Sequence, residues 1–449
     1  MIAAAMTRTR RLLDRLLGDD LARKLARGGL AALVIKVGAA GLSFLMFLVL
    51  ARAMSAEDFG RFGFGFSLAT LLAVAGSFGQ RMLVLRFAPV YDHDGDRQKL
   101  AGVVRDGYRL VALGCGLLGL ATVVTGLLWP GLAARGYLVA AGVFTLVLGL
   151  AEYQAHVLRA FGGMLLSLGP RDILWRAGVI LLALGAALGL LPKLDAAGGL
   201  WLTAGVLAAV VAGQALAHPV TRPAALFAGP ADTSDRPTWR HAMWGLWASS
   251  FIRTAAPNLA VVVLGLVLTP EATGPFFAAL RLSMLLNLFL MAANMIAAPM
   301  IARTYHRGDR DDLQRLCAHV SVGLTLPTLA VFLVFVLAGD RLLELFGTGY
   351  AAYYWVLIVL SVGYLVNALS GSTSQLMEMT GDERYYLRIV TVVNGIAIAA
   401  LAPLSLLLGP LGAAIALTFS QCAWNASCIL RSRTRCKVDP SILSFLYKP

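Results

Sequence analysis

The chain has 449 residues, of which 59% are hydrophobic and only 14% are charged, and its mean hydropathy is +0.76. These values are typical of a polytopic membrane protein and lie far outside the range of soluble globular domains. The net charge of +14 would favour a nucleic-acid partner in a soluble chain. In a membrane protein basic residues report topology instead, so we expect no nucleic-acid binding. The polar stretches are too short for a nucleotide-binding or catalytic domain.

The hydropathy pattern predicts an all-α membrane protein with twelve transmembrane helices. Helices are expected because backbone polar groups in lipid must be paired within their own segment. The predicted spans are residues 29–51, 62–86, 108–129, 137–158, 172–191, 198–218, 243–268, 274–301, 316–338, 353–373, 386–408 and 410–430.

Basic residues are scarce in the predicted external turns, which hold only Arg52, Arg61, Arg135, Lys193 and Arg341. This asymmetry predicts that both termini lie in the cytoplasm. Together, the apolar spans and the distribution of basic residues predict a multi-pass protein of the cytoplasmic membrane.

Five predicted regions follow from this pattern. The first interleaves leucine with arginine, which favours an amphipathic helix on the cytoplasmic leaflet; a partly ordered basic tail is the alternative. The regions are a cytoplasmic amphipathic basic helix (1–28), an N-terminal six-helix bundle (29–218), a cytoplasmic linker (219–242), a C-terminal six-helix bundle (243–430) and a basic cytoplasmic tail (431–449).

The second half of the chain repeats the first. The segment SAEDFG at 55–60 aligns with TPEATG at 269–274, an offset of 214 positions, and we interpret 55–60 as a turn between helices. Each half holds an even number of spans, so the two six-helix bundles are related by a pseudo-twofold axis along the membrane normal. Such parallel repeats place a substrate site between the bundles, near the midplane.

Two cations lie inside apolar spans. Lys36 lies in the first span, where a lysine must snorkel, find a partner or line a wet cavity. Arg253 lies at similar depth in the seventh span, the repeat counterpart of the first. A pair of cations on matching helices suits an anionic ligand held between two bundles. Pro257 should kink the seventh helix at Arg253, because it cannot donate a hydrogen bond to that carbonyl.

Other candidate residues for substrate binding are less specific. Arg281 and Asn287 share the eighth span but lie on faces about 120° apart, so only one faces the cavity unless the helix twists. Asn287 and Asn294 could instead hold helices together. Arg81 is either a ligand contact or an interfacial anchor at the inner end of the second span. Arg52 lies at the outer end of the first span.

Glu152 and His156 lie one turn apart in the fourth span, where they could carry a proton or form a structural pair. Proton or sodium coupling is therefore open, and we expect no other cofactor. We expect no metal, since the five cysteines form no CxxC and have no histidine at ligand spacing. The GxGxxG match at 114–119 lies in an apolar span without a preceding strand, which indicates helix packing. We expect no enzyme activity.

Several motifs together resemble a known family. They are the R-x-x-S-x-E-x-F-G-x-F turn from Arg52 to Phe62, the G-D-R loops at 95–97 and 308–310, and MTGDE at 379–383. This pattern resembles the polysaccharide-exporter branch of the multidrug/oligosaccharidyl-lipid/polysaccharide (MOP) flippase superfamily. The resemblance implies a bacterial inner-membrane flippase that moves an undecaprenyl-pyrophosphate-linked oligosaccharide repeat unit outward by alternating access, for surface polysaccharide and exopolysaccharide biosynthesis.

What the resemblance implies for the site is that Lys36, Arg253 and Arg281 meet the lipid pyrophosphate. The expected partners are the lipid-linked oligosaccharide, membrane lipid, and a polysaccharide polymerase or glycosyltransferase, and we expect a monomer. One alternative is a cation-coupled multidrug exporter of the same superfamily, whose relatives rely on acidic residues in the N-terminal half. The other is a non-transporting membrane partner of a glycan synthase.

Overall fold

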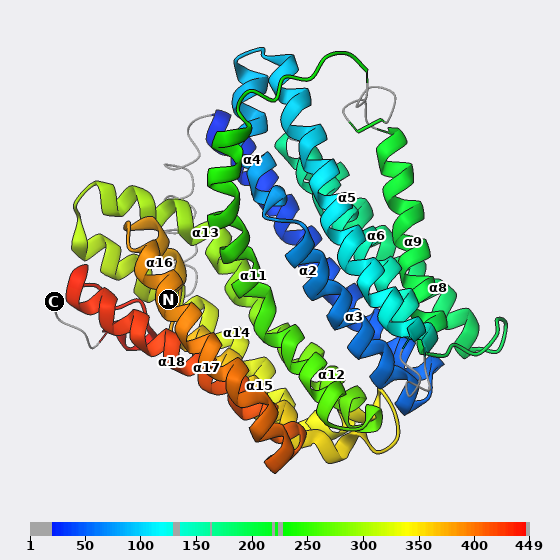
Figure 1. Ribbon diagram of the computed structural model, residues 1–449. Helices are drawn as coiled ribbons and strands as arrows, with labels where there is room; N and C mark the ends of the chain where they lie inside the picture. Colours follow the sequence, from blue (N-terminus) through cyan, green and yellow to red (C-terminus); the bar gives the residue numbers. More distant parts are fainter. Residues whose placement is uncertain (1–19, 129–134, 162–163, 218–220, 223–227, 446–449) are drawn as a thin grey trace.

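The structure, a computed structural model, describes residues 20–128, 135–161, 164–217, 221–222 and 228–445. Within these ranges the chain folds into helices and connecting segments, without a strand (Figure 1). The helices gather in two halves, which lie on either side of the molecule in Figure 1. The predicted all-α fold is confirmed.

The N-terminal half consists of α2 (Asp20–Ala53), α3 (Ala56–Gly76), α4 (Gln80–His93), α5 (Arg97–Leu128), α6 (Arg135–Ala160), α7 (Met164–Leu168), the π-helix η1 (Gly169–Leu174), α8 (Trp175–Ala187) and α9 (Ala196–Ala217). The C-terminal half consists of α11 (Arg236–Val267), α12 (Pro270–Ser283), the 3-10 helix η2 (Met284–Leu286), α13 (Asn287–His306), α14 (Arg310–Glu344), the 3-10 helix η3 (Tyr350–Tyr353), α15 (Tyr354–Leu369), α16 (Thr373–Met379), α17 (Glu383–Leu408), α18 (Pro410–Arg435) and the 3-10 helix η4 (Ile442–Phe445).

Ten helices in the described ranges are long and apolar enough to cross a bilayer. Helix α11 is an eleventh crossing if its two parts, which are bent by 53° between Ile252 and Thr254, count as one span. The remaining predicted crossing corresponds to η1 followed by α8, which has only 13 residues. The protein is therefore a multi-pass membrane protein with the predicted twelve-span plan.

The predicted second and eighth spans are broken helices. The second is divided into α3 and α4 by a segment in which Phe78 and Gly79 have positive φ angles of 45° and 70°. A Cβ at Gly79 would also lie 2.7 Å from the backbone nitrogen of Trp247, so glycine suits both the conformation and the contact. The eighth is divided into α12 and α13 by η2. The two halves thus share this break as well as their sequence motif.

The segment at 55–60 is the start of a helix and not the predicted turn. Ser55 caps α3, because its hydroxyl oxygen accepts a hydrogen bond of 3.1 Å from the backbone N–H of Asp58. Thr269 occupies the corresponding cap position of α12, and Pro270 follows at the first helical residue. The repeated motif therefore encodes two equivalent helix starts.

These two helix starts pack directly against each other. A Cβ on Gly60 would lie 1.9 Å from the carbonyl oxygen of Pro270, and a Cβ on Gly274 would lie 3.0 Å from that of Ala56. The offset of 214 positions makes Gly60 equivalent to Gly274 and Ala56 equivalent to Pro270. The same contact is therefore made once from each half, as a pseudo-twofold axis requires. We call this part of the molecule, at the bottom of Figure 1, the closed end.

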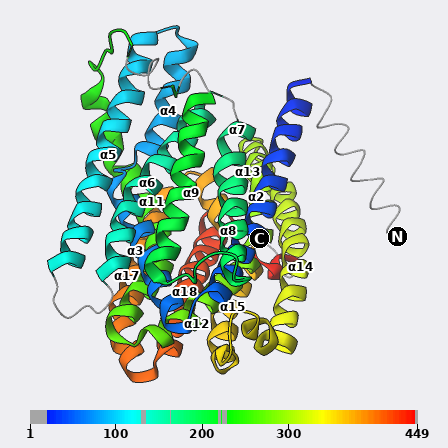
Figure 2. The ribbon, with the colours of Figure 1, turned by 90° about the vertical axis from the view of Figure 1, so that its right-hand side faces the viewer.

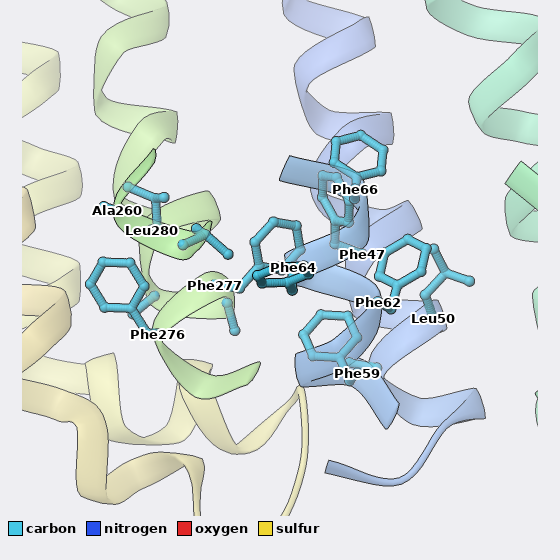
Figure 3. Packing of buried hydrophobic residues seen from close by; sticks show 14 of the residues in the cluster. Phe47, Leu50, Phe59, Phe62, Phe64, Phe66, Ala260, Phe276, Phe277 and Leu280 are labelled. Carbon is cyan, nitrogen blue, oxygen red and sulfur yellow. The ribbon is translucent and has the colours of Figure 1, made fainter. Parts of the chain in front are cut away.

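Aromatic packing and one arginine reinforce the closed end. Phe59, Phe66 and Phe277 are fully or almost fully buried where the halves meet (Figure 3). Arg52, at the end of α2, donates a hydrogen bond of 2.8 Å to the carbonyl oxygen of Glu344 and another to that of Leu345. Because these carbonyls end α14, the arginine both caps that helix and joins the two halves.

The helices also pair across the interface in a symmetric way. Helix α11 lies along α3, and α2 lies beside α13 and α12 (Figure 2). The first and seventh spans, which the repeat makes equivalent, thus each contact the broken span of the opposite half.

The predicted region boundaries stay predictions, but the structure places several of their residues. Residues 1–19 lie outside the described part, and α2 begins at Asp20, inside the predicted amphipathic segment. Helix α11 begins at Arg236, inside the predicted linker. In the predicted tail, the Asp439 carboxylate accepts a hydrogen bond from Arg433, and its backbone N–H donates to Gln314. This part of the tail is packed on α14.

The reciprocal glycine contact predicts a position-specific effect of one methyl group. We expect Gly60→Ala to lower the free energy of unfolding by ~1–3 kcal/mol, because the overlapped atom is backbone and moves little. Thermal unfolding of the purified protein in detergent measures this change. The control is Gly116→Ala in α5, where an added Cβ meets no atom within 4 Å. Equal unfolding temperatures for the two variants would contradict the contact.

Candidate functional site

A cavity of about 260 Å³ lies between the two halves. Its walls come from α2, from η1 and α8, and from α12, η2 and α13. Among the residues whose side chains the structure describes, four charged ones line it: Lys36, Asp172, Arg176 and Arg281. The cavity therefore presents three cations and one carboxylate at the meeting point of the predicted bundles.

Asp172 is the centre of an ion-pair cluster. One carboxylate oxygen lies 2.7 Å from Nζ of Lys36, and the other lies 3.0 Å from Arg171 and 3.5 Å from Arg176. The side chain of Asp172 is 3% exposed. The wide turn of the π-helix η1 places Arg171 and Asp172 at the inner face of the bundle, and such turns often occur at functional sites.

A second carboxylate extends the cluster away from the cavity. Glu152 on α6 forms ion pairs with Arg171 and, at 3.3 Å, with Arg81. His156 donates from Nδ1 to the backbone carbonyl of Glu152 at 2.6 Å. Arg81 is thus held inside the N-terminal half by an ion pair. The proton-coupling role predicted for Glu152 and His156 stays a prediction.

The cluster carries excess positive charge. Four cations (Lys36, Arg81, Arg171 and Arg176) meet two carboxylates (Glu152 and Asp172). Burying charge in a membrane-spanning fold is costly unless each charge has partners, so a cluster with surplus cations favours an anionic ligand.

Arg281 differs from the other cavity cations because it has no carboxylate partner in the described part of the chain. Its guanidinium carbon lies 4.6 Å from the ring centroid of Phe277, 5.0 Å from that of Phe47 and 5.4 Å from that of Phe66. Its Nε is buried and makes no hydrogen bond. The rings are grouped where α2, α3 and α12 meet (Figure 3). They fix the guanidinium at the cavity wall by cation–π contact and leave its charge uncompensated.

The remaining predicted residues are not all brought together. Arg253 lies at the bend of α11, where the Pro257 pattern predicts a kink, and its side chain is outside the described part. Arg52 belongs to the closed end, away from the cavity. Asn287 follows the break η2 and lines a second cavity. Arg281 and Asn287 lie on either side of this break, and each lines a cavity. The two helix faces that were expected to be alternatives therefore both border a cavity.

The second cavity, of about 650 Å³, lies within the C-terminal half. Its walls combine asparagine, glutamine, serine and aromatic side chains from α13 and α15–α18 with apolar residues, among them those of α11. Met284 and Met291 line both cavities, so the two are neighbours.

The sequence reasoning missed Arg171, Asp172 and Arg176. The predicted fifth span begins at residue 172, so Arg171 precedes it and Asp172 and Arg176 lie in its first turns, where charges are commonly interfacial. The signal was the R-D-x-x-x-R spacing after Gly169-Pro170, which puts Asp172 and Arg176 one turn apart. Only the π-helix shows that these residues turn towards Lys36.

Comparison with solved structures identifies the class of fold. The chain is similar to an inward-facing multidrug resistance MATE family transporter of the MOP superfamily, with a TM-score of 0.71 at 14% identity over 92% of this chain and 98% of that one. It is also similar to the lipid II flippase MurJ in an inward closed conformation, with a TM-score of 0.69 at 13% identity over 93% and 91%. For an outward-facing multidrug resistance MATE family transporter, the TM-score is 0.61 at 15% identity over 95% of this chain and 98% of that one. The fold is that of MOP-superfamily membrane transporters.

A family model described as polysaccharide biosynthesis protein matches residues 25–305. The chain belongs to this family, and with its fold this places it in the polysaccharide-exporter branch of the MOP superfamily. No curated protein matches the chain.

The ion-pair cluster predicts a large effect of removing one carboxylate. We expect Asp172→Asn to lower the free energy of unfolding by ~3–5 kcal/mol, because Lys36 and Arg176 would lose their carboxylate partner. Thermal unfolding in detergent measures the loss. The control is Glu57→Gln, which breaks an ion pair with Arg61 whose acid is 44% exposed, and we expect a loss of less than ~1 kcal/mol. A smaller loss for Asp172→Asn than for the control would contradict the cluster.

Proposed function

We propose that this protein is a flippase that moves a polyprenyl-pyrophosphate-linked oligosaccharide repeat unit from the cytoplasmic to the outer leaflet of the bacterial inner membrane. Its role would be in surface polysaccharide biosynthesis. The proposal combines the family and fold, which are those of transporters, with the charge of the cavity between the halves. We also propose that both termini lie in the cytoplasm, as the distribution of basic residues predicts.

The observation that carries the proposal is Arg281. In the described part of the chain this guanidinium contacts three aromatic rings and donates one weak hydrogen bond, to the sulfur of Met284 at 3.8 Å. Its remaining donors, including the buried Nε, are available to a ligand in the cavity. Arginine binds phosphate oxygens through its planar fork of donors. Lys36 and Arg176 line the same cavity and already share Asp172.

The charge balance of the cavity supports a diphosphate. In the described part of its lining, three cations and one carboxylate leave an excess of two positive charges. A diphosphate esterified at both ends retains one ionised oxygen on each phosphate, so it matches this excess. The cavity lies between α2 and α12–α13, and the polyprenyl tail would remain in lipid outside these helices.

The closed end supports a transport cycle by alternating access. If the termini are cytoplasmic, the closed end faces outward and the structure is an inward-facing state. This agrees with the TM-scores, which are 0.71 against the inward-facing MATE transporter and 0.61 against the outward-facing one. Export would then require separation of the Gly60 and Gly274 helix starts and release of Arg52 from α14. An inside-negative potential favours outward movement of negative charge by about 2.3 kcal/mol per charge per 100 mV.

The alternative of a cation-coupled drug exporter has less support. An exporter of cationic drugs needs an acidic group that is free to bind cations. Within the described part of the cavity and its cluster, Asp172 and Glu152 each contact at least two cations. The surplus charge is positive, which favours an anionic substrate.

The proposal predicts that transport depends on the charge and shape of Arg281. We expect Arg281→Gln to lower the initial rate of flipping by about tenfold or more, since a charge-assisted hydrogen bond contributes ~1.5–3 kcal/mol. Arg281→Lys should retain an intermediate rate, because it keeps the charge and loses the fork. The assay follows a fluorescent polyprenyl-pyrophosphate-linked oligosaccharide in proteoliposomes.

The matched control for this assay is Arg315→Gln, which removes an arginine whose side chain is 72% exposed. It should flip the lipid at the wild-type rate. Wild-type flipping by Arg281→Gln, with the variant correctly folded, would refute the anionic site.

A further inference from the structure

The cavity of about 650 Å³ in the C-terminal half has a chemistry unlike that of the charged cavity beside it. Among lining residues whose side chains are described, none is acidic or basic. The polar lining consists mainly of amides and hydroxyls, and the volume lies within the ~300–1,000 Å³ range of small-molecule sites. The amides are Asn287, Asn294, Asn367, Gln375, Asn394 and Gln421.

Part of this amide set is held in place by the protein. The Ser420 hydroxyl donates to the Asn394 side-chain oxygen at 2.7 Å. Trp424 donates from Nε1 to the Gln421 side-chain oxygen at 3.0 Å, which fixes the tryptophan beside the amide. These bonds orient groups that each keep further hydrogen-bonding capacity.

Another part of the set is free. Within the described part of the protein, Gln375 makes no side-chain hydrogen bond, and the side-chain oxygen of Asn294 is buried without a partner. A buried amide oxygen without a hydrogen bond is costly, so a ligand that donates to it is favoured. The ligand must supply donors and acceptors together, since amides present both.

Aromatic side chains complete the lining. Trp424 and Tyr364 face the cavity, and Tyr386 packs edge-on against Trp424 with ring centroids 5.9 Å apart. An aromatic ring offers an apolar face beside a polar group. A sugar has the matching pattern, because its hydroxyls both donate and accept while one face of its ring carries C–H groups.

We propose that this cavity binds the uncharged sugar residues of the transported lipid. The inference rests on the proposed function and adds the chemical class of the cargo. The diphosphate would lie on the Lys36, Arg176 and Arg281 side, and the glycan would extend past Met284 and Met291, which line both cavities. Methionine side chains adapt their shape readily, so they form a wall that a glycan can displace.

The test compares two lipids on purified full-length protein in nanodiscs, with affinity measured by native mass spectrometry. One lipid is undecaprenyl pyrophosphate, and the other carries an uncharged trisaccharide of N-acetylhexosamine and hexose on the same pyrophosphate. We expect wild-type protein to bind the glycosylated lipid about tenfold more tightly, as two or more added hydrogen bonds allow.

The variant is Asn294→Leu with Gln375→Leu, which puts an apolar side chain of similar size at each position. It removes amide groups that have no hydrogen-bond partner in the described part of the protein. It should bind both lipids with the affinity that wild-type protein has for undecaprenyl pyrophosphate. The control is Gln98→Leu, which removes an exposed amide outside both cavities and should keep the wild-type preference. Unfolding temperatures verify that each variant is folded.

Three outcomes would overturn the inference, and they separate it from the proposed function. If undecaprenyl pyrophosphate binds but the trisaccharide adds no affinity, or the double variant keeps the preference, the sugar site is wrong and the flippase proposal stands. If neither lipid binds wild-type protein, the proposed function fails and the inference fails with it.

Discussion

The burial of positive charge inside a membrane-spanning fold is the constraint on which the rest of the site depends. Asp172 and Glu152 neutralise part of this charge by connecting four helical elements through Lys36, Arg171 and Arg81. Arg281 is held differently, by the quadrupoles of three phenylalanine rings. Such rings orient a guanidinium but leave its net charge for a ligand. We propose that the N-terminal half and α12 together form a preorganised anion site.

The internal repeat explains why the two halves have the same arrangement of helices. The charged cavity is formed by positions at which the two halves carry different residues. The reciprocal contacts of Gly60 and Gly274 are symmetric, as the offset of 214 positions requires. By the same offset, the repeat equivalent of Arg281 is the buried Ser67, and the repeat equivalent of Lys36 is Ser250. Symmetric positions close one end, whereas asymmetric positions separate a charged cavity from an amide-lined one. We infer that a duplicated scaffold was adapted to hold two chemically different parts of one molecule.

Much of this architecture is predictable from the sequence, because long apolar segments and a repeated motif leave few alternatives. The cost of intramembrane cations marks Lys36 and Arg281 as candidates for a cavity wall. The partners of Lys36 do not follow, because a π-helix alters which side chains share a face. The orientations of Arg281 and Asn287 depend likewise on the 3-10 break between them, which an ideal helical wheel of 100° per residue cannot represent.

The binding affinity of the purified protein for two lipids with the same tail tests the central claim most directly. The lipids are undecaprenyl pyrophosphate and undecaprenol, which differ only in the charged diphosphate. If the surplus cations of the cavity bind the diphosphate, the charged lipid should bind at least about a hundredfold more tightly, as two charge-assisted contacts imply. Equal affinities for the two lipids would contradict the account.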